Sequence, residues 1–249
     1  MGIGKTRSLM TRSPRTKIDE ADYRRGAWIV FLVALAVLIA DQTLKIWVKT
    51  NFYLGESLEI FPWWELKFIE NNGMAFGMEL WNKFVLTFGR IAAVIFFIWI
   101  ISKVIRERKW RTGFLVSLAL ITAGAAGNII DCVFYGELFS APMPPAVAEF
   151  LPPGGGYAGW FEGRVVDMMY FPIVTWTWPS WLPFIGGTEF EFFQYIFNIA
   201  DAAICVGVAM LIFFYSKDAS MAYALLWGDS EKDKVSGNGS EADTKNVKK

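Results

Sequence analysis

The chain has 249 residues, of which 54% are hydrophobic and 19% charged, and its 24 basic and 24 acidic residues cancel. A soluble domain carries about a quarter charged residues, so the apolar excess indicates a membrane protein, and a neutral chain does not favour nucleic acid as a partner. Histidine is absent and there are only two cysteines, which excludes Ser-His-Asp and Cys-His catalytic groups and the usual zinc sites.

Four apolar stretches follow a polar and basic leader at residues 1–26. Their approximate bounds are 27–48, 84–101, 114–130 and 195–215. Each is close to the roughly 20 residues with which a helix crosses the bilayer. The first stretch could be a removed signal peptide, but its apolar character continues beyond Lys45, which favours a retained span. The sequence therefore predicts a membrane α-helical protein with four transmembrane helices over residues 27–215.

The distribution of basic residues predicts the orientation. The leader contains seven and the connection between the second and third stretches contains five, whereas connection 132–193 contains only Arg164. Because loops rich in lysine and arginine remain in the cytoplasm, both termini are expected there. Connections 49–83 and 132–193 are expected outside. The tail at residues 216–249 is polar and mixed in charge from residue 228, which predicts disorder there.

The two outer connections carry short strand patterns. Residues 64–68 alternate apolar and charged side chains and lead into a turn sequence at residues 71–73. Residues 165–166 and 175–178 are further strand candidates. Seven of the twelve tryptophans also lie in these connections, which suits segments at the level of the lipid headgroups. We therefore expect a small extracytoplasmic β-containing region, interrupted by an irregular proline- and glycine-rich insertion at about 139–162.

Polar residues within the apolar stretches are the informative ones. They comprise Asp41, Lys45, Arg90, Asn128, Asp131, Asn198 and Asp201. A charged residue at mid-helix costs about 2.5–3.5 kcal/mol on insertion scales, so such residues usually face a bundle interior and carry function. In the predicted orientation all of them lie in the outer halves of their helices, on the side of Asn71 and Asp167. Inert groups wetted at the interface would not be expected to gather at one depth.

Asp167 and Asp201 are the candidates for chemistry, because each carboxylate lies in an apolar run. Two close carboxylates in a low dielectric share a proton. The ionised one can accept a proton from water as the water attacks a peptide carbonyl, and the protonated one can donate to the carbonyl oxygen. If the two residues converge, the sequence predicts an aspartic protease that needs no metal or cofactor.

Five motifs, in order along the chain, resemble those of the lipoprotein signal peptidase (signal peptidase II) family. They are Asp41-Gln42-Thr43-Leu44-Lys45, Asn71-Asn72-Gly73-Met74-Ala75-Phe76-Gly77, Gly124-Ala125-Ala126-Gly127-Asn128-Ile129-Ile130-Asp131, Gly163-Arg164-Val165-Val166-Asp167 and Phe197-Asn198-Ile199-Ala200-Asp201. One such motif would be weak, but five in the family's order are specific. The resemblance covers about residues 27–215 and excludes the leader and the tail.

The resemblance implies an aspartic endopeptidase with Asp167 and Asp201 as its catalytic residues. Its substrate would be a prolipoprotein with diacylglyceryl on the cysteine after the cut, cleaved at the outer face of the bacterial cytoplasmic (inner) membrane. Membrane lipid would be the other partner, and a monomer is expected. Residues that bind substrate or support the dyad would be Asn71, Gly73, Asn128, Asp131, Asn198 and Arg164. Structural polar groups would be Asp41, Lys45 and Arg90.

Two departures from the family pattern and one alternative function stay open. The family usually has arginine directly after the aspartate of its third motif, where this chain has Cys132, and Arg164 could take its place. The insertion at 139–162 would be an added flap or partner surface. Cys132 and Cys205 are expected to be ordinary buried thiols. The alternative function is an ion- or proton-coupled transporter that uses the same acids, although the inner halves of the helices are almost purely apolar.

Overall fold

The computed structural model describes residues 18–71, 81–107 and 109–227, and four helices form the bundle within these ranges. They are α1 (Glu20–Asn51), α2 (Trp81–Glu107), α3 (Thr112–Leu138) and α4 (Ile199–Phe213). Within the described ranges, α1, α2 and α3 are long and apolar enough to cross a membrane. The shorter α4 qualifies only together with the next helix, Ser216–Trp227, from which it is bent by 89°. The predicted membrane α-helical class is confirmed, with three or four candidate spans.

Large apolar side chains cover the outer surfaces of α1 and α2. Trp28 and Phe31 of α1 are 59% and 53% exposed, and Ile95 and Ile98 of α2 are 62% and 52% exposed. Such a continuous apolar surface would favour aggregation in water. In a bilayer it would face lipid chains, which agrees with the hydropathy of the sequence.

Helix α3 lies at the centre of the bundle and packs against α1, α2 and α4. Small residues let it approach its neighbours closely: a Cβ at Gly124 would lie 2.3 Å from the Ala200 carbonyl oxygen of α4. A Cβ at Gly127 would lie 2.7 Å from Asp41 Oδ2 of α1. Small residues at helix contacts are typical of membrane proteins, and here they bring the polar residues of three helices together.

Two helices begin where capping side chains place them. Helix α1 begins at Glu20, inside the predicted leader, because the Asp19 side chain accepts a hydrogen bond from the Ala21 amide and acidic residues occupy the first turn. Helix α4 begins at Ile199, four residues later than expected, because Asn198 caps it. The first three predicted spans therefore lie within longer helices, whereas the fourth extends beyond α4 at both ends. The leader up to residue 17 and the predicted disorder from residue 228 lie outside the described residues.

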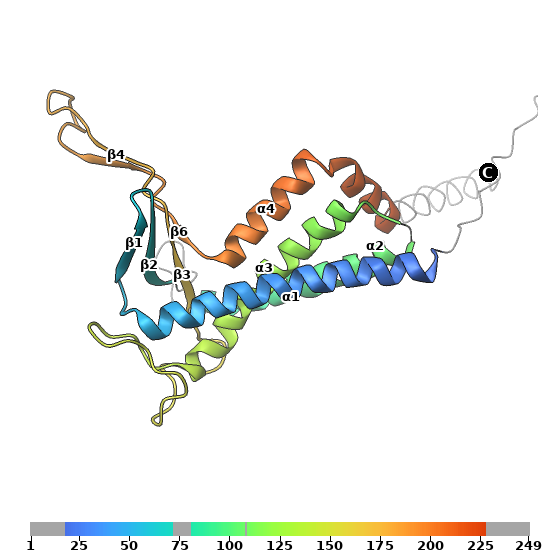
Figure 1. Ribbon diagram of the computed structural model, residues 1–249, viewed down its shortest axis with the longest axis horizontal. Coiled ribbons are helices and arrows are strands. Elements are labelled where there is room, and N and C mark those ends of the chain that lie inside the picture. The colour runs from blue at the N-terminus through green and yellow to red at the C-terminus, as the bar shows by residue number, and fades with distance from the viewer. Residues whose placement is uncertain (1–17, 72–80, 108, 228–249) are drawn as a thin grey trace, which may run out of the picture.

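A four-stranded sheet lies beyond the C-terminal end of α1, at one end of the helices (Figure 1). Its strands are β1 (Ser57–Phe61), β2 (Trp64–Asn71), β3 (Val165–Tyr170) and β6 (Ile196–Phe197), in the order β1-β2-β3-β6 with antiparallel neighbours. In the β2–β3 pair, Ile69 lies opposite Asp167 and Asn71 opposite Val165. The predicted β-containing region and the strand patterns at 64–68 and 165–166 are confirmed.

A separate hairpin pairs β4 (Val174–Thr177) with β5 (Glu189–Phe192). It extends away from the helices in Figure 1, and every residue of β4 is exposed. The strand candidate at 175–178 is therefore confirmed with bounds one residue earlier, as part of this hairpin, which is separate from the four-stranded sheet.

One buried apolar cluster holds the sheet against the helix ends. Its members are Val48, Phe52, Leu66, Phe68, Tyr135, Phe139, Ala148, Val166 and Met168. They come from α1 and its C-cap Phe52, from β2, α3 and β3, and from the connection that follows α3. The backbone amide of Ala148 also donates to the Lys49 carbonyl oxygen, 3.3 Å away. The predicted insertion is thus irregular in structure but packs on the protein through this cluster.

Candidate active site

The two candidate catalytic acids lie on different elements, Asp167 in strand β3 and Asp201 at the start of helix α4. Asp167 lies in β3 and is only 2% exposed. Asp201 lies in the first turn of α4 and is partly buried. Asn198 fixes that turn, because its Oδ1 accepts a hydrogen bond from the Asp201 amide at 2.9 Å. The cap therefore sets the position of the second carboxylate relative to the sheet.

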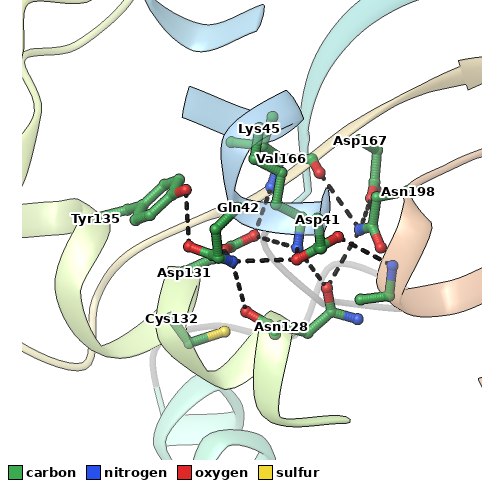
Figure 2. A network of polar contacts seen from close by, with 12 residues as sticks. Asp41, Gln42, Lys45, Asn128, Asp131, Cys132, Tyr135, Val166, Asp167 and Asn198 are labelled. Atoms are coloured by element: carbon green, nitrogen blue, oxygen red, sulfur yellow. Dashed lines mark hydrogen bonds and ion pairs between the residues drawn. The ribbon is translucent and has the colours of Figure 1, made fainter. Parts of the chain in front are cut away.

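Two asparagine side chains connect the two carboxylates. Asn198 Nδ2 donates to Asp167 Oδ1 at 2.6 Å and to Asn128 Oδ1 at 3.2 Å. Asn128 Nδ2 donates to Asp201 Oδ1 at 2.7 Å. On its other side, Asp167 Oδ2 accepts from Asn71 Nδ2 at 3.2 Å. Figure 2 shows Asn198 between Asp167 and Asn128. The two acids that the sequence singled out are thus joined in one hydrogen-bonded chain, and three of the predicted supporting residues belong to it.

The environment of Asp167 favours its protonated form. Burial raises the pKa of Asp167, the negative charge of Asp201 raises it further, and the Asn71 and Asn198 amides oppose the rise, with a result of about 7. A carboxyl group with such a pKa holds its proton in a large fraction of molecules at neutral pH, while a second carboxylate lies close by. This is the arrangement that acid–base chemistry by two carboxyl groups requires.

A buried lysine holds the helices together behind the acids. Lys45 Nζ lies 2.9 Å from Asp41 Oδ2 and 2.8 Å from Asp131 Oδ2, and all three side chains are completely buried. The same ammonium donates to Asn128 Oδ1 at 2.9 Å. Three bonds from one cation thus connect α1 to α3 and to the asparagine that supports Asp201 (Figure 2).

Asp41 and Asp131, which both bind Lys45, also fix the backbone of the segments that carry the two candidate catalytic acids. Asp41 Oδ1 accepts a hydrogen bond from the Ala200 amide of α4 at 2.9 Å. Asp131 Oδ2 accepts one from the Val166 amide of β3 at 3.2 Å. Because these carboxylates are buried and bonded on both oxygens, they act on the site by positioning backbone. This placement fits the structural role expected for Asp41 and Lys45, and gives Asp131 the same kind of role.

The remaining predicted residues lie around this centre. Arg164 Nη1 pairs with Glu70 Oε2 at 3.0 Å, and Arg90 Nη1 donates to Cys132 Sγ at 3.4 Å. The guanidinium that reaches the place of the missing family arginine is therefore that of Arg90. Gly73 lies outside the described residues. Cys205 is exposed, so its prediction as a buried thiol is wrong, because its side of α4 is not covered by another helix; Cys132 is buried as expected.

Sequence reasoning missed several polar residues of the site. Gln42 Nε2 donates to Asp131 Oδ1 at 3.0 Å and its Oε1 accepts from Tyr135 Oη at 3.1 Å. Lys49 and Glu70 form a second buried ion pair. Sequence spacing could have indicated Lys49 and Tyr135 as members of the site. Lys49 follows Lys45 by four residues and Tyr135 follows Asp131 by four, which places each pair on one helix face.

Known proteins resemble this chain over most of its length. Residues 33–217 match the family model of signal peptidase (SPase) II. Lipoprotein signal peptidases from two strains of Porphyromonas gingivalis are each 47% identical over 214 residues, which are 86% of this chain and 89% of theirs. The lipoprotein signal peptidase of Amoebophilus asiaticus is 35% identical over 198 residues, 76% of this chain and 78% of that protein.

The fold also matches a solved bacterial membrane enzyme whose structure was determined by the in meso method at 1.9 Å resolution. The TM-score is 0.51 at 23% sequence identity, with 80% of this chain and 96% of that chain covered. This likeness concerns the fold alone. The family match and the close relatives confirm the resemblance that the five motifs predicted, and the chain belongs to the signal peptidase II family.

Proposed function

We propose that this protein is an aspartic endopeptidase of the bacterial cytoplasmic membrane that removes signal peptides from diacylglyceryl-modified prolipoproteins. Its family consists of signal peptidases, and its close relatives are named lipoprotein signal peptidases. The observation that carries the aspartic mechanism is the hydrogen-bonded chain from Asp167 through Asn198 and Asn128 to Asp201. Neither the family nor the relatives favour the transporter alternative.

In the proposed reaction the two carboxyl groups share one proton. Asp201, as the ionised partner, takes a proton from a water molecule while the water oxygen attacks the scissile carbonyl carbon. Asp167, as the protonated partner, donates its proton to the carbonyl oxygen. When the tetrahedral intermediate collapses, the C–N bond breaks, Asp201 returns its proton to the departing amine, and Asp167 regains its own. Asn71, Asn128 and Asn198 hold the carboxylates in place throughout.

The substrate would approach through the membrane. A signal peptide is an apolar helix, so it can enter laterally between the spans, and its diacylglyceryl group would keep the scissile bond near the headgroups. With both termini in the cytoplasm, the sheet and the acids lie at the outer face, where this bond would be. The protein would act as a monomer, because one chain supplies both acids and their supporting residues.

A lipidated precursor peptide is expected to be cleaved in proteoliposomes, and the same peptide without lipid is expected to lose most of this cleavage. Each buried methylene contributes about 0.8 kcal/mol to membrane anchoring, so the acyl chains hold the cut site at one depth beside the acids. Mass spectrometry of the products measures both rates and locates the cut before the cysteine. Equal rates with and without lipid would contradict the proposed substrate class.

The pH dependence of kcat/KM tests the proposed state of the dyad in the free enzyme. Because the pKa of Asp167 in the substrate-free protein is about 7, kcat/KM is expected to fall as pH rises through that value and the proton to be donated is lost. The folded pKa also lies above the ordinary 3.8, so the folded state loses stability as pH rises from about 4 to about 7. Rates are therefore divided by the folded fraction. A kcat/KM that stays constant from about pH 6 to about pH 9, which is about one unit below that pKa to about two units above it, would contradict the assignment.

A further inference from the structure

A second group of charges, centred on a buried ion pair, lies beside the dyad and takes no part in the reaction just described. Lys49 Nζ forms an ion pair with Glu70 Oε1, and their side chains are 0% and 2% exposed. The other carboxylate oxygen, Glu70 Oε2, accepts from Arg164 Nη1 at 3.0 Å. One carboxylate is therefore shared by two cations from α1 and from the segment before β3. The Arg164 side chain is 39% exposed, so the group buries two charges, those of Lys49 and Glu70. Burying this ion pair is costly, so it adds little stability but strongly constrains the geometry.

Aromatic rings enclose this group. Lys49 Nζ lies 5.8, 5.4 and 5.1 Å from the ring centroids of Phe68, Phe139 and Tyr157. The Arg164 guanidinium lies 5.3 Å from the Tyr157 ring, and the Arg164 amide donates to Tyr157 Oη at 2.7 Å. Such cation–π contacts are strongest where water is excluded. Phe139 and Tyr157 come from the 139–162 insertion, which thus supplies two of the three rings.

The group of Lys49, Glu70 and Arg164 lies at the end of β2. This end of the strand carries Asn71, the residue that donates to Asp167. Glu70 directly precedes Asn71, whose Nδ2 donates to Asp167 Oδ2. Arg164 directly precedes β3, and Glu70 and Asn71 pair with Val166 and Val165 of that strand. A shift of the Glu70 carboxylate would therefore move the end of β2 and with it the Asn71 amide.

We propose that Lys49, Glu70 and Arg164, closed in by Phe139 and Tyr157, position Asn71 against Asp167, and that this is the role of the 139–162 insertion. The inference rests on the proposed function, because it takes Asp167 as catalytic. These are positioning residues: they reach the reaction only through Asn71. The insertion would then fix the end of β2 beside β3, the strand that carries Asp167.

A double-mutant cycle of Glu70→Gln and Asn71→Ala tests the proposal in the full-length protein. Glu70→Gln is expected to lower kcat about 10- to 100-fold with KM nearly unchanged, because the Asn71 amide is displaced. The falling limb of the pH profile should move to higher pH in both single variants, because the Asn71 hydrogen bond lowers the pKa of Asp167. In the Asn71→Ala background, Glu70→Gln should have little further effect.

Tyr157→Phe provides a milder variant in case Glu70→Gln does not fold. It keeps the ring over Lys49 and removes only the acceptor of the Arg164 amide, so it should lower kcat less than Tyr157→Ala and shift the pH limb in the same direction. Met143→Ala is the matched control, because this side chain of the same insertion is 71% exposed; its kcat and pH limb should equal those of the parent.

Additive effects in the cycle, or an unshifted pH limb with unchanged kcat per folded enzyme in Glu70→Gln and Tyr157→Ala, would overturn the positioning role. Thermal unfolding in detergent gives the folded fraction for each variant. An active Asp167→Asn variant would instead contradict the proposed function itself. An inactive Asp167→Asn variant together with a fully active Glu70→Gln variant would contradict only the positioning role of Lys49, Glu70 and Arg164.

Discussion

Asp167→Asn and Asp201→Asn are each expected to abolish cleavage of a lipidated precursor, with losses of at least roughly 10²–10⁴-fold in kcat. Asparagine keeps the size of the side chain and its acceptor oxygen, but it cannot bind or release the proton that the reaction moves. Asp167 accepts from Asn198 and Asn71, and Asp201 accepts from Asn128. Each asparagine can retain at least one of these bonds, so the proteins should remain folded.

Cleavage of a lipidated peptide by detergent-solubilised protein, divided by the folded amount from thermal unfolding, measures this effect. Cys205→Ala is a matched control, because Cys205 lies four residues after Asp201 on the same helix and is exposed. It should retain the parent rate. Near-full activity of either asparagine variant would contradict the assignment of these two acids as a catalytic pair.

The same two acids were predicted from the sequence, for a physical reason. A carboxylate in an apolar run must be accommodated by other polar groups. Asn198 precedes Asp201 by three residues in the same motif, whereas the motif that ends in Asp167 holds no asparagine and its partners come from other segments. Asn128 and Asn198 are now seen to connect the two acids directly. The helices and strands were predictable for a related reason, because hydropathy and alternation describe which faces are buried.

The parts that escaped prediction depend on contacts between distant residues. Lys49 and Glu70 are 21 positions apart, and Glu70 and Arg164 are 94 apart, so no local pattern links them. The insertion at 139–162 has no hydrophobic period, and its role follows only from where Tyr157 lies. Helix starts were displaced because Asp19 and Asn198 cap them, and a cap changes the bounds of a helix without changing its hydropathy.

Helix α1 emerges as the scaffold of the site. Asp41, Lys45 and Lys49 follow one another at intervals of four residues and are all buried, so they form one polar stripe along the helix. Asp41 and Lys45 hold the start of α4 and the asparagine that supports Asp201. Lys49 holds Glu70 at the end of β2. One helix face therefore aligns the helix that carries one acid with the sheet that carries the other.

The centre of that stripe gives the largest expected effect on stability. Lys45→Met is expected to lower the free energy of unfolding by about 3–5 kcal/mol, because it leaves the buried carboxylates of Asp41 and Asp131 without their shared cation. Methionine fills most of the space of the lysine stem, so the loss reports charge more than a cavity. Thermal or denaturant unfolding in detergent measures it. Lys103→Met, at an exposed position of α2, should change stability by less than about 0.5 kcal/mol.

The double variant Lys45→Met with Asp131→Asn identifies the cause of this loss. Removing one stranded carboxylate should restore part of the stability, because an asparagine at position 131 is uncharged and its Oδ1 can still accept from the Val166 amide. If stranded charge were not the cause, the second substitution would add a further loss by weakening the bonds that Asp131 makes to Gln42 and β3. A double variant less stable than Lys45→Met alone would therefore contradict the electrostatic account and indicate that packing around Lys45 holds α1 to α3.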